Sequence, residues 1–314
     1  MKRQVDNKLI ICGSGGLGKL TKLQKNNVTI HSATFFTLMT NIYAITNQKG
    51  GVGKTTSAVN LSAYLAAAGK RVLLVDMDPQ ANASSSLGVP KNPPNGSSYE
   101  LLLGAAPASK VTLKNGRLNL SIIPSSPNLA AAEIELVGEI GREHRLRQAL
   151  AEEAGKYDYI LMDCPPSLGL LTVNALTAST GALVPVQTEY LALEGLSQLQ
   201  RTTQLVRQRL NPETRIRGLI LTMYDARTQL SQQVAAEVEK IFGPLVFKTR
   251  IPRSVRLSEA PSHGQPILTY APNSPGGAAY AALAKELLAQ DFPSVAEPSP
   301  ETEPAQAQPA EVTP

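Results

Sequence analysis

The chain has 314 residues, of which 42% are hydrophobic, 18% are charged and none is tryptophan, and its formal net charge is +5. This composition is typical of a soluble globular protein and excludes a fibrous or wholly disordered one. No apolar run approaches the roughly 20 residues of a membrane-spanning helix, and the N-terminus lacks a signal-peptide pattern, so we expect a cytoplasmic protein without a membrane partner.

The chain divides into three regions. Residues 1–40 carry six basic residues and one acidic residue, lack a clear period and lead into a strand-like segment just after Met39. We interpret them as an N-terminal extension that is disordered or precedes the true start. Residues 41–290 are predicted to form the folded domain. Residues 291–314 hold six prolines and five acidic residues but no basic one, which predicts a disordered acidic tail.

Apolar runs and helical patterns alternate within the folded domain. The first elements are a strand over residues 42–46, a helix over 55–68 that ends at Gly69, and a strand over 71–76. Further strand-like runs lie at residues 120–123, 159–162, 182–186, 218–222 and 246–249. Continuous apolar strands separated by helices predict an α/β fold, with a doubly wound, mostly parallel sheet covered by helices on both faces.

The segment between the first strand and the first helix carries the strongest functional signal. It reads Lys49-Gly50-Gly51-Val52-Gly53-Lys54-Thr55-Thr56. Glycines allow backbone N–H groups to close on phosphate oxygens, and a helix N-terminus favours an anion. We expect this loop to bind a nucleotide, with Lys54 at the β- and γ-phosphates and the Thr55 hydroxyl on Mg²⁺. The usual glycine five residues before Gly53 is replaced by Gln48.

Acidic residues follow two of the predicted strands. Asp76 and Asp78 come after the strand at 71–76, and Asp163 follows the run at 159–162. Ligands of open α/β sheets bind at the carboxyl ends of strands, and a carboxylate there can hold Mg²⁺, partly through water. For any one of these aspartates alone, a turn or helix-cap role would be the better explanation. Their joint order favours a metal site.

The run from Lys49 to Thr56 resembles the deviant phosphate-binding loop, or Walker A motif, of the ParA/MinD family of P-loop ATPases. The resemblance implies that Lys49 is the signature lysine, which reaches the phosphates of the facing subunit in a nucleotide-bound dimer. It also implies that Asp163 holds the metal shell, that Asp76 lies near the metal, and that Asp78 orients or activates the attacking water. Lys49, Lys54 and Asp78 are then the catalytic residues.

Three further segments, at residues 185–195, 222–228 and 251–262, resemble the chromosomal ParA, or Soj, branch of this family. The resemblance covers about residues 41 to 290. By the same resemblance, Met223 and Pro252 line the adenine pocket.

Positive charge is concentrated between residues 201 and 256, which hold eleven basic and four acidic residues. Such an excess favours an anionic partner, although a solvated helix face would look the same. Members of the branch bind DNA through surface arginines, and Arg227, Arg253 and Arg256 lie within the matching segments. The resemblance therefore implies that these three arginines contact DNA.

The resemblance implies an ATPase of DNA segregation, acting on chromosome or plasmid. It would form a sandwich homodimer with ATP and Mg²⁺ and bind double-stranded DNA without sequence preference. Hydrolysis, slow alone and stimulated by a ParB-type centromere-binding protein, would release the DNA. We accordingly expect a cytoplasmic protein associated with the nucleoid.

The sequence bears on three alternatives. A MinD-like membrane-cycling ATPase should end in a basic amphipathic helix, whereas this chain ends in an acidic, proline-rich segment. An iron–sulfur carrier needs cluster-ligating cysteines, and Cys12 and Cys164 do not form such a set. We expect Cys164 to be a core residue. A DNA-binding module without turnover would not need the loop lysine and the aspartates together.

Overall fold

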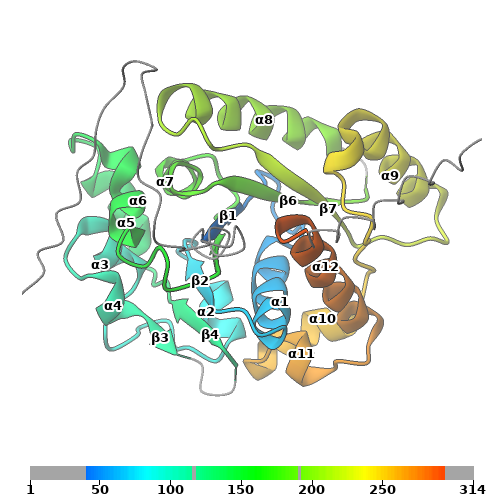
Figure 1. Cartoon of the computed structure of the whole chain (residues 1–314), viewed down its shortest axis with the longest axis horizontal. Helices are drawn as coiled ribbons and strands as arrows, with labels where there is room; N and C mark the ends of the chain where they lie inside the picture. The colour runs from blue at the N-terminus through cyan, green and yellow to red at the C-terminus, as the bar shows by residue number, and fades with distance from the viewer. Residues whose placement is uncertain (1–39, 115–117, 190–191, 294–314) are drawn as a thin grey trace, which may run out of the picture. The chain divides into compact units, whose positions relative to one another are not determined.

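The computed structural model describes residues 40–114, 118–189 and 192–293. Figure 1 shows the described elements as coloured ribbons around a central sheet. The predicted N-terminal extension up to residue 39, with Cys12, and the acidic tail beyond Pro293 lie outside the described residues. The predictions for these two segments therefore stay predictions.

One sheet of seven strands runs through the described residues in the order β3-β4-β2-β5-β1-β6-β7 (Figure 1). Every neighbouring pair is parallel except the edge pair of β3 and β4. This arrangement confirms the predicted, mostly parallel α/β sheet. The strands are β1 Asn41–Ile45, β2 Val72–Asp76, β3 Leu113–Lys114, β4 Leu120–Ile123, β5 Tyr159–Asp163, β6 Gly181–Gln187 and β7 Ile216–Thr222.

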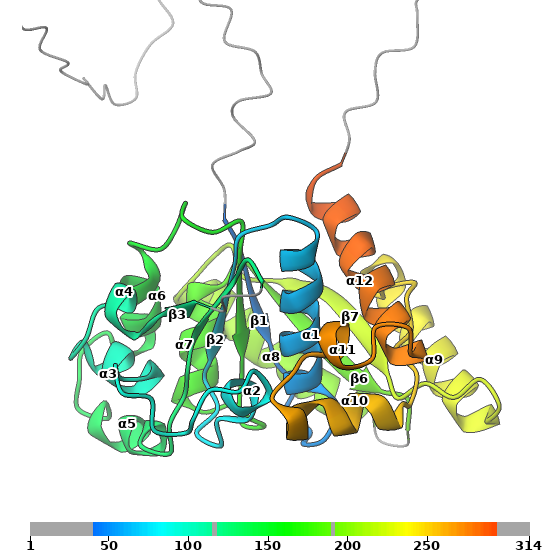
Figure 2. The same cartoon turned by 90° about the horizontal axis from the view of Figure 1, so that it is seen from below.

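Helices cover both faces of the sheet. On one face α1 and α12 lie side by side with α10 and α11 near them, and on the other lie α3, α5, α6, α7 and α8 (Figures 1 and 2). The helices are α1 Lys54–Ala67, α2 Asn82–Ser86, α3 Ser98–Leu103, α4 Ala108–Val111, α5 Leu129–Glu135, α6 Arg145–Leu150, α7 Leu170–Ala178, α8 Ala192–Arg209, α9 Gln229–Phe242, α10 Val255–Glu259, α11 Ile267–Tyr270 and α12 Pro275–Asp291.

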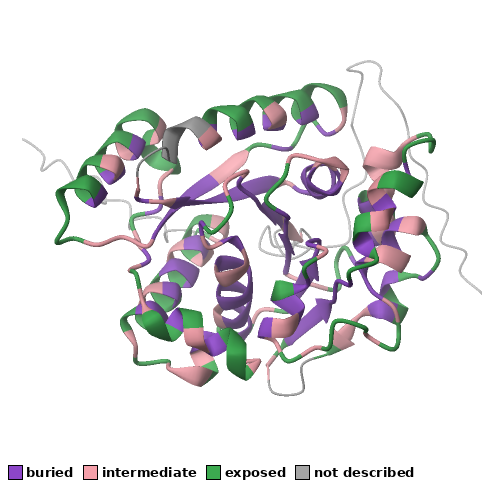
Figure 3. Ribbon diagram, turned by 180° about the vertical axis from the view of Figure 1, so that it is seen from behind, coloured by how far each residue is buried: buried purple, intermediate pink, exposed green. Residues whose placement is uncertain are grey.

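The sequence builds two hydrophobic cores because side chains alternate across each strand. In β2, Leu73 and Val75 point into the core beneath α3, α6 and α7, while Val72 and Leu74 point into the core beneath α1 and α12. Ten of the 14 residues of α1 are buried, and Figure 3 shows this helix enclosed around most of its circumference. The first helix is therefore fixed firmly against the sheet, and the loop before it is fixed with it.

The strand predicted at residues 246–249 is wrong. Val246 forms only an isolated bridge to Leu219. The backbone N–H groups of Lys248 and Thr249 instead donate to the Glu286 carboxylate on α12 at 2.7 and 3.0 Å. Phe247 and Ile251 still donate to the carbonyls of Leu219 and Leu221 on β7 at 2.9 and 2.8 Å. The side-chain acceptor between these two bonds interrupts the ladder, so no continuous strand forms. The two-residue edge strand β3 was not predicted either, since so short a pair of residues carries no period.

A buried polar network closes the amino end of the sheet. Asp291, the last residue of α12, accepts hydrogen bonds from Arg217 at 2.6 Å, Tyr43 at 2.8 Å and Tyr159 at 2.9 Å. Burial raises the pKa of both tyrosines, and the Asp291 carboxylate raises it further. The fold thus uses Asp291, one residue past the predicted end of the domain, to hold α12 on the strands.

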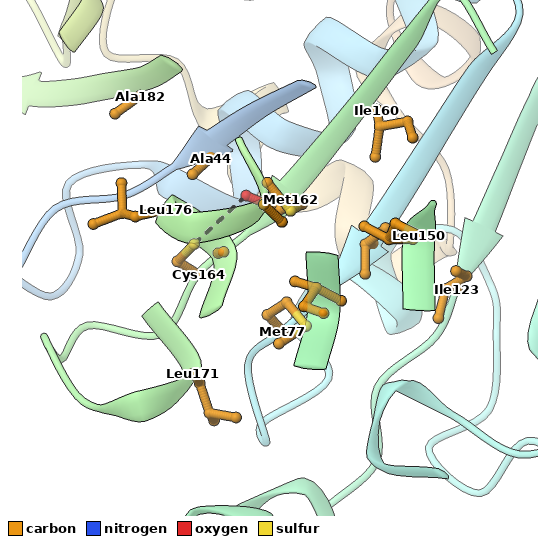
Figure 4. Close-up of a cluster of buried hydrophobic side chains, with 14 of the residues drawn as sticks. Ala44, Met77, Ile123, Leu150, Ile160, Met162, Cys164, Leu171, Leu176 and Ala182 are labelled. Atoms are coloured by element: carbon orange, nitrogen blue, oxygen red, sulfur yellow. Dashed lines mark hydrogen bonds between the residues drawn. The ribbon is translucent and has the colours of Figure 1, made fainter. Parts of the chain in front are cut away.

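Cys164 is a core residue at the carboxyl end of β5, as expected. The residue is 1% exposed, and its thiol faces the Met162 carbonyl at 3.7 Å (Figure 4). Burial raises the pKa of this thiol, and the nearby Asp163 carboxylate adds to the effect. The thiolate that reactive or metal-binding cysteines use is therefore disfavoured.

Candidate nucleotide-binding site

The glycine-rich loop connects β1 to α1 and is held by the sheet beneath it. Gly51 and Gly53 have φ values of 73° and 86°, in the left-handed region where glycine is favoured. Between them Val52 is 1% exposed, and its carbonyl accepts a hydrogen bond of 2.9 Å from the Thr222 hydroxyl on β7. The loop is therefore fixed at its centre, while Gly50 remains exposed.

Lys54 folds back over the loop from the first turn of α1. Its Nζ donates to the Lys49 carbonyl at 3.0 Å, and the residue is 7% exposed. Burial lowers the pKa of Lys54, and the charges of Asp163 and Asp78 act in the opposite direction. The ammonium group thus reaches across the loop. The oxygens of a bound anion would replace the Lys49 carbonyl as its hydrogen-bond acceptor, and they would carry charge.

Lys49 is positioned through its backbone. Its N–H donates to Asn47 Oδ1 at 3.0 Å, and Asn47 Nδ2 donates to the Pro185 carbonyl on β6 at 2.8 Å. Among the described residues, the ammonium group of Lys49 has no hydrogen-bond or ion-pair partner. The loop therefore presents one lysine that is engaged within it and one whose charge is available.

Asp163 ends β5 next to the loop, and both its carboxylate oxygens are buried without a hydrogen bond. Burial raises the pKa of Asp163 well above its usual value, with the charge of Asp76 as the next cause. The Thr55 hydroxyl lies near enough to favour the charged form, but it does not reach hydrogen-bonding geometry. Buried oxygens without partners are costly, so this pair fits an ion or its water shell.

Asp76 ends β2 and has a different environment. Its Oδ2 accepts from the Ser84 N–H at 2.8 Å and the Ser84 hydroxyl at 2.7 Å, while its Oδ1 accepts from the Asp78 N–H at 3.2 Å. Burial raises the pKa of Asp76 to about 6, although these hydrogen bonds oppose the shift. Both oxygens hold the turn that follows β2, whereas those of Asp163 accept no hydrogen bond.

Asp78 lies on that turn and is 7% exposed. Its Oδ1 accepts from the Gln80 N–H at 2.9 Å, and its charge acts on both Lys54 and Asp163. The structure therefore brings together the loop, Thr55 and all three predicted aspartates at one end of the sheet. Within the described chain, no group of three or more His, Cys, Asp or Glu residues could hold a metal by itself. Mg²⁺ often takes only one or two carboxylates, with phosphates and water completing its shell.

A pocket of about 210 Å³ opens beside the loop. Its lining includes Gly53 and Thr56 as well as Ile251 and the predicted adenine-pocket residues Met223 and Pro252. Met223 has a φ of 51°, which is uncommon for a residue other than glycine. Besides Met223, Pro252 and Ile251, the lining includes the polar residues Thr222, Arg253, Ser254 and Ser258. The pocket therefore offers a base both apolar contacts and polar groups.

The three predicted DNA-binding arginines lie on the surface, and each is ion-paired. Arg227 pairs with Asp225 at 2.8 Å, Arg253 with Glu189 at 2.6 Å and Arg256 with Glu259 at 2.9 Å. Their side chains are 89%, 63% and 59% exposed, respectively. The local charge excess is therefore smaller at these arginines than the sequence count suggests.

Sequence reasoning missed the residues that position the site. Asn47 holds Lys49, Thr222 holds the loop, and Ser84 connects Asp76 to the Ser125 N–H at 3.0 Å. Asn47 and Thr222 are ordinary polar residues at or just beyond strand ends, whereas Ser84 lies within α2, eight residues after Asp76. For Asn47 and Thr222, the position at the carboxyl end of a strand was the only signal that could have marked them, and Ser84 carried no such signal.

Comparisons with known proteins agree with this geometry. Residues 40–216 match the family model described as an AAA domain. The sporulation initiation inhibitor protein Soj of Bacillus subtilis is 57% identical over 251 residues, 80% of this chain and 99% of that protein. The chromosome partitioning protein ParA of Myxococcus xanthus is 51% identical over 252 residues, 80% of this chain and 89% of that protein.

A solved structure is also similar. The cobyrinic acid a,c-diamide synthase of Mycobacterium smegmatis, with bound ADP and magnesium, matches with a TM-score of 0.71 at 38% identity, over 80% of this chain and 95% of that one. A parallel sheet with a glycine-rich loop between its first strand and a helix defines a P-loop nucleotide-binding protein. The similarity over most of the chain places it further. The chain belongs to the ParA/Soj family of ATPases, as its motifs predicted.

Proposed function

We propose that this chain binds ATP with Mg²⁺ and hydrolyses it as an ATPase of DNA segregation. The observation that carries the proposal is the pair of lysines on one loop: Lys54 is engaged across it, while Lys49 has an available charge. A phosphate loop that served a single subunit would need only Lys54. The names of the Soj and ParA relatives refer to sporulation and chromosome partitioning, and they support the same proposal.

The residues around the loop divide the work on the nucleotide. Lys54 would neutralise the β- and γ-phosphates, and Met223 and Pro252 would hold the adenine. The Thr55 hydroxyl and the unpaired oxygens of Asp163 fit a Mg²⁺ ion, directly and through water. The magnesium would supply charge neutralisation at the phosphates when bound.

The two remaining aspartates have separate parts in the proposal. Asp76 holds the turn after β2 through Ser84, which sets the position of Asp78. Asp78 orients or activates the attacking water. The resemblance implies that Asp76 lies near the metal, whereas its hydrogen-bonded oxygens favour a positioning role instead.

Dimerisation completes the site in this proposal. Lys49 of each subunit would reach the phosphates in the facing subunit, which places a positive charge where the transition state needs it. A subunit alone lacks that charge, so slow intrinsic hydrolysis follows, and a ParB-type partner would stimulate it.

DNA would bind to the surface that carries Arg227, Arg253 and Arg256. Each phosphate contact adds a sequence-independent increment that salt weakens. Because each arginine is paired with a carboxylate, DNA must compete with that pair, so single contacts are weak. A dimer joins two such surfaces, and the second binds at a high effective concentration. Binding that depends on ATP then follows from dimerisation.

The test measures binding of double-stranded DNA to the full chain with ADP, ATP or a non-hydrolysable ATP analogue over a salt series. Tight, salt-sensitive binding with ATP or the analogue, but not with ADP, is expected. Equal binding in all three states would contradict the proposal. Binding to anionic lipid vesicles with ATP, in place of DNA, would favour the MinD-like alternative. The described residues contain no helix that is long and apolar enough to cross a bilayer.

The name of the Mycobacterium smegmatis protein denotes a different reaction, which this chain is not proposed to catalyse. Its bound ADP and magnesium support only the choice of ligand. The ligand choice has its own measurement, which is nucleotide affinity with and without Mg²⁺. ATP affinity that did not depend on Mg²⁺ would contradict the role given to Thr55 and Asp163.

A further inference from the structure

A groove of about 990 Å³ lies at the end of the sheet away from the nucleotide loop, where β1 and β7 begin and α12 ends. Figure 2 shows the last turn of α12 at the opposite end of the molecule from α10 and the first turn of α1. The charged residues that line the groove are Arg207, Arg215, Arg217, Glu213 and Asp291. The nucleotide site uses none of them.

The charges in this groove are unbalanced. Arg217 is paired with Asp291 at 2.6 Å. Arg207 on α8 and Arg215 before β7 are exposed, and within the described residues neither has an ion-pair partner. Glu213 is the one other acidic residue in the described lining. Two available cations therefore face a single available carboxylate, so the groove favours an anionic occupant.

The chain itself supplies such an occupant. Pro293, the last described residue before the tail, lines the groove. The 21 residues that follow, 294–314, include four glutamates and no basic residue. Glu297 comes four residues after Pro293, and four extended residues span roughly 13 Å. The first glutamate is thus tethered within reach of the groove.

We propose that the acidic segment 294–314 folds back into this groove and pairs its glutamates with Arg207 and Arg215. Val295 would cover the apolar part of the lining, where Leu245 is 39% exposed. Tethering gives the segment a high effective concentration that an untethered anion must exceed. Its prolines, which begin with Pro298 and Pro300, restrict the free chain and reduce the entropy lost on docking.

This docking would make the acidic segment an electrostatic cover for part of the basic stretch 201–256. The cover goes beyond the proposed function and does not depend on ATP or DNA. It weakens as salt rises, because exposed ion pairs are screened. The two arginines could instead bind the phosphates of a nucleic acid. The test distinguishes that ligand from the acidic segment.

The test uses the full chain with Val295→Trp, which provides the only tryptophan in the protein. Fluorescence emission and acrylamide quenching are compared with those of a free peptide of residues 294–314 that carries the same tryptophan. Docking predicts blue-shifted emission and weaker quenching in the protein at about 50 mM salt. Both effects should be lost at about 1 M salt, where the Debye length falls to roughly 3 Å.

Matched variants separate docking from non-specific burial of the tryptophan. The double variant Arg207→Gln/Arg215→Gln should lose the protection, as should replacement of the four glutamates by glutamine. The control is the double variant Arg201→Gln/Arg209→Gln, which changes two residues on the same helix as Arg207 but outside the groove lining. It removes the same amount of charge, and the tryptophan should stay protected.

Two results would overturn the proposal. One is quenching equal to that of the free peptide at low salt. The other is protection that the Arg207→Gln/Arg215→Gln change leaves intact. If the tryptophan is unprotected while that change weakens DNA binding, the groove belongs to nucleic acid and the docked tail is rejected.

Discussion

At the carboxyl end of the sheet, Lys54 and Asp163 are buried among fixed neighbours, whereas Arg227 and Arg253 project from the surface with 89% and 63% of their side chains exposed. A buried charge acts in a low-dielectric setting, so its removal cannot be compensated by water. An exposed, paired arginine is screened and replaceable. Single substitutions should therefore be enough to abolish nucleotide binding or hydrolysis. DNA binding should be lost only when several of the surface arginines are replaced.

The largest effect is expected at the loop lysine. Lys54→Ala should weaken ATP binding by at least about 100-fold, because truncation removes a buried charge that pairs with phosphate. Titration calorimetry of the variant checks this. The control is Lys110→Ala, which changes an exposed lysine on α4 that is not part of the candidate nucleotide site. This variant should bind ATP as the parent does. Similar ATP affinities in both variants would remove the role of Lys54.

The next largest effect is on turnover. Asp78→Ala should lower ATP hydrolysis by roughly 10²–10³-fold while ATP binding persists, because the water loses the group that orients it. The variant should then remain on DNA after ATP is added. Phosphate release and DNA dissociation are measured together. Rapid hydrolysis by this variant would mean that Asp78 has only a structural role on the turn.

The third expected effect is smaller, and it is a gain in stability where the first two are losses of function. Asp163→Asn should stabilise the nucleotide-free protein against urea by about 1–3 kcal/mol, because it removes a buried carboxylate that accepts no hydrogen bond. The nearby charge of Lys54 offsets only part of that cost, since burial is the larger influence on the pKa of Asp163. Burial raises the folded-state pKa of Asp163, so ionisation of this group destabilises the parent as pH rises above the unfolded-state value of about 4. The gap between variant and parent should therefore be wider at about pH 8 than at about pH 5.

The control for that experiment is Asp225→Asn. Hydrogen bonds from Arg227 lower the pKa of Asp225 to about 2, so this carboxylate contributes stability above its unfolded pKa and loses it as pH falls. Its replacement should cost a little stability at neutral pH. An Asp163→Asn variant less stable than the parent at about pH 8 would contradict the cost assigned to the buried pair of oxygens.

The smallest effect is expected on the surface. Arg227→Ala should weaken ATP-dependent DNA binding a few-fold and reduce the salt slope by about 1, with ATP binding unchanged. Arg147→Ala, an exposed arginine on α6 outside the basic stretch, is the matched control. An unchanged salt slope for Arg227→Ala would exclude it from the contact surface. A complete loss of binding would instead break the contrast between the two regions.

The sequence predicted those features that depend on neighbouring residues. The loop, the helix after it and the buried strands are local patterns of glycine and apolar residues, and the order of Asp76, Asp78 and Asp163 followed from strand ends. Tertiary partners could not be predicted in this way. Thr222 meets Val52 across 170 positions, and Glu286 takes the N–H of Lys248 across 38, which removed the expected last strand.

The arginine pairs show the same limit. Arg253 meets Glu189 across 64 positions, so a count of charges within 201–256 could not include that carboxylate. The different environments of Asp76 and Asp163 were also hidden, because they depend on Ser84 and on the donors that each carboxylate lacks. The charge that a residue offers to a ligand is therefore known only when its partners in the fold are known.

The left-handed backbone at Met223 has a consequence for how the protein could change under selection. The left-handed backbone conformation costs a residue other than glycine of order 1 kcal/mol or more, and a glycine at position 223 would relieve that strain. A library screened for heat resistance alone should therefore accumulate Met223→Gly, while one screened for nucleotide use should retain the side chain that lines the pocket. The two selections would diverge at a single codon.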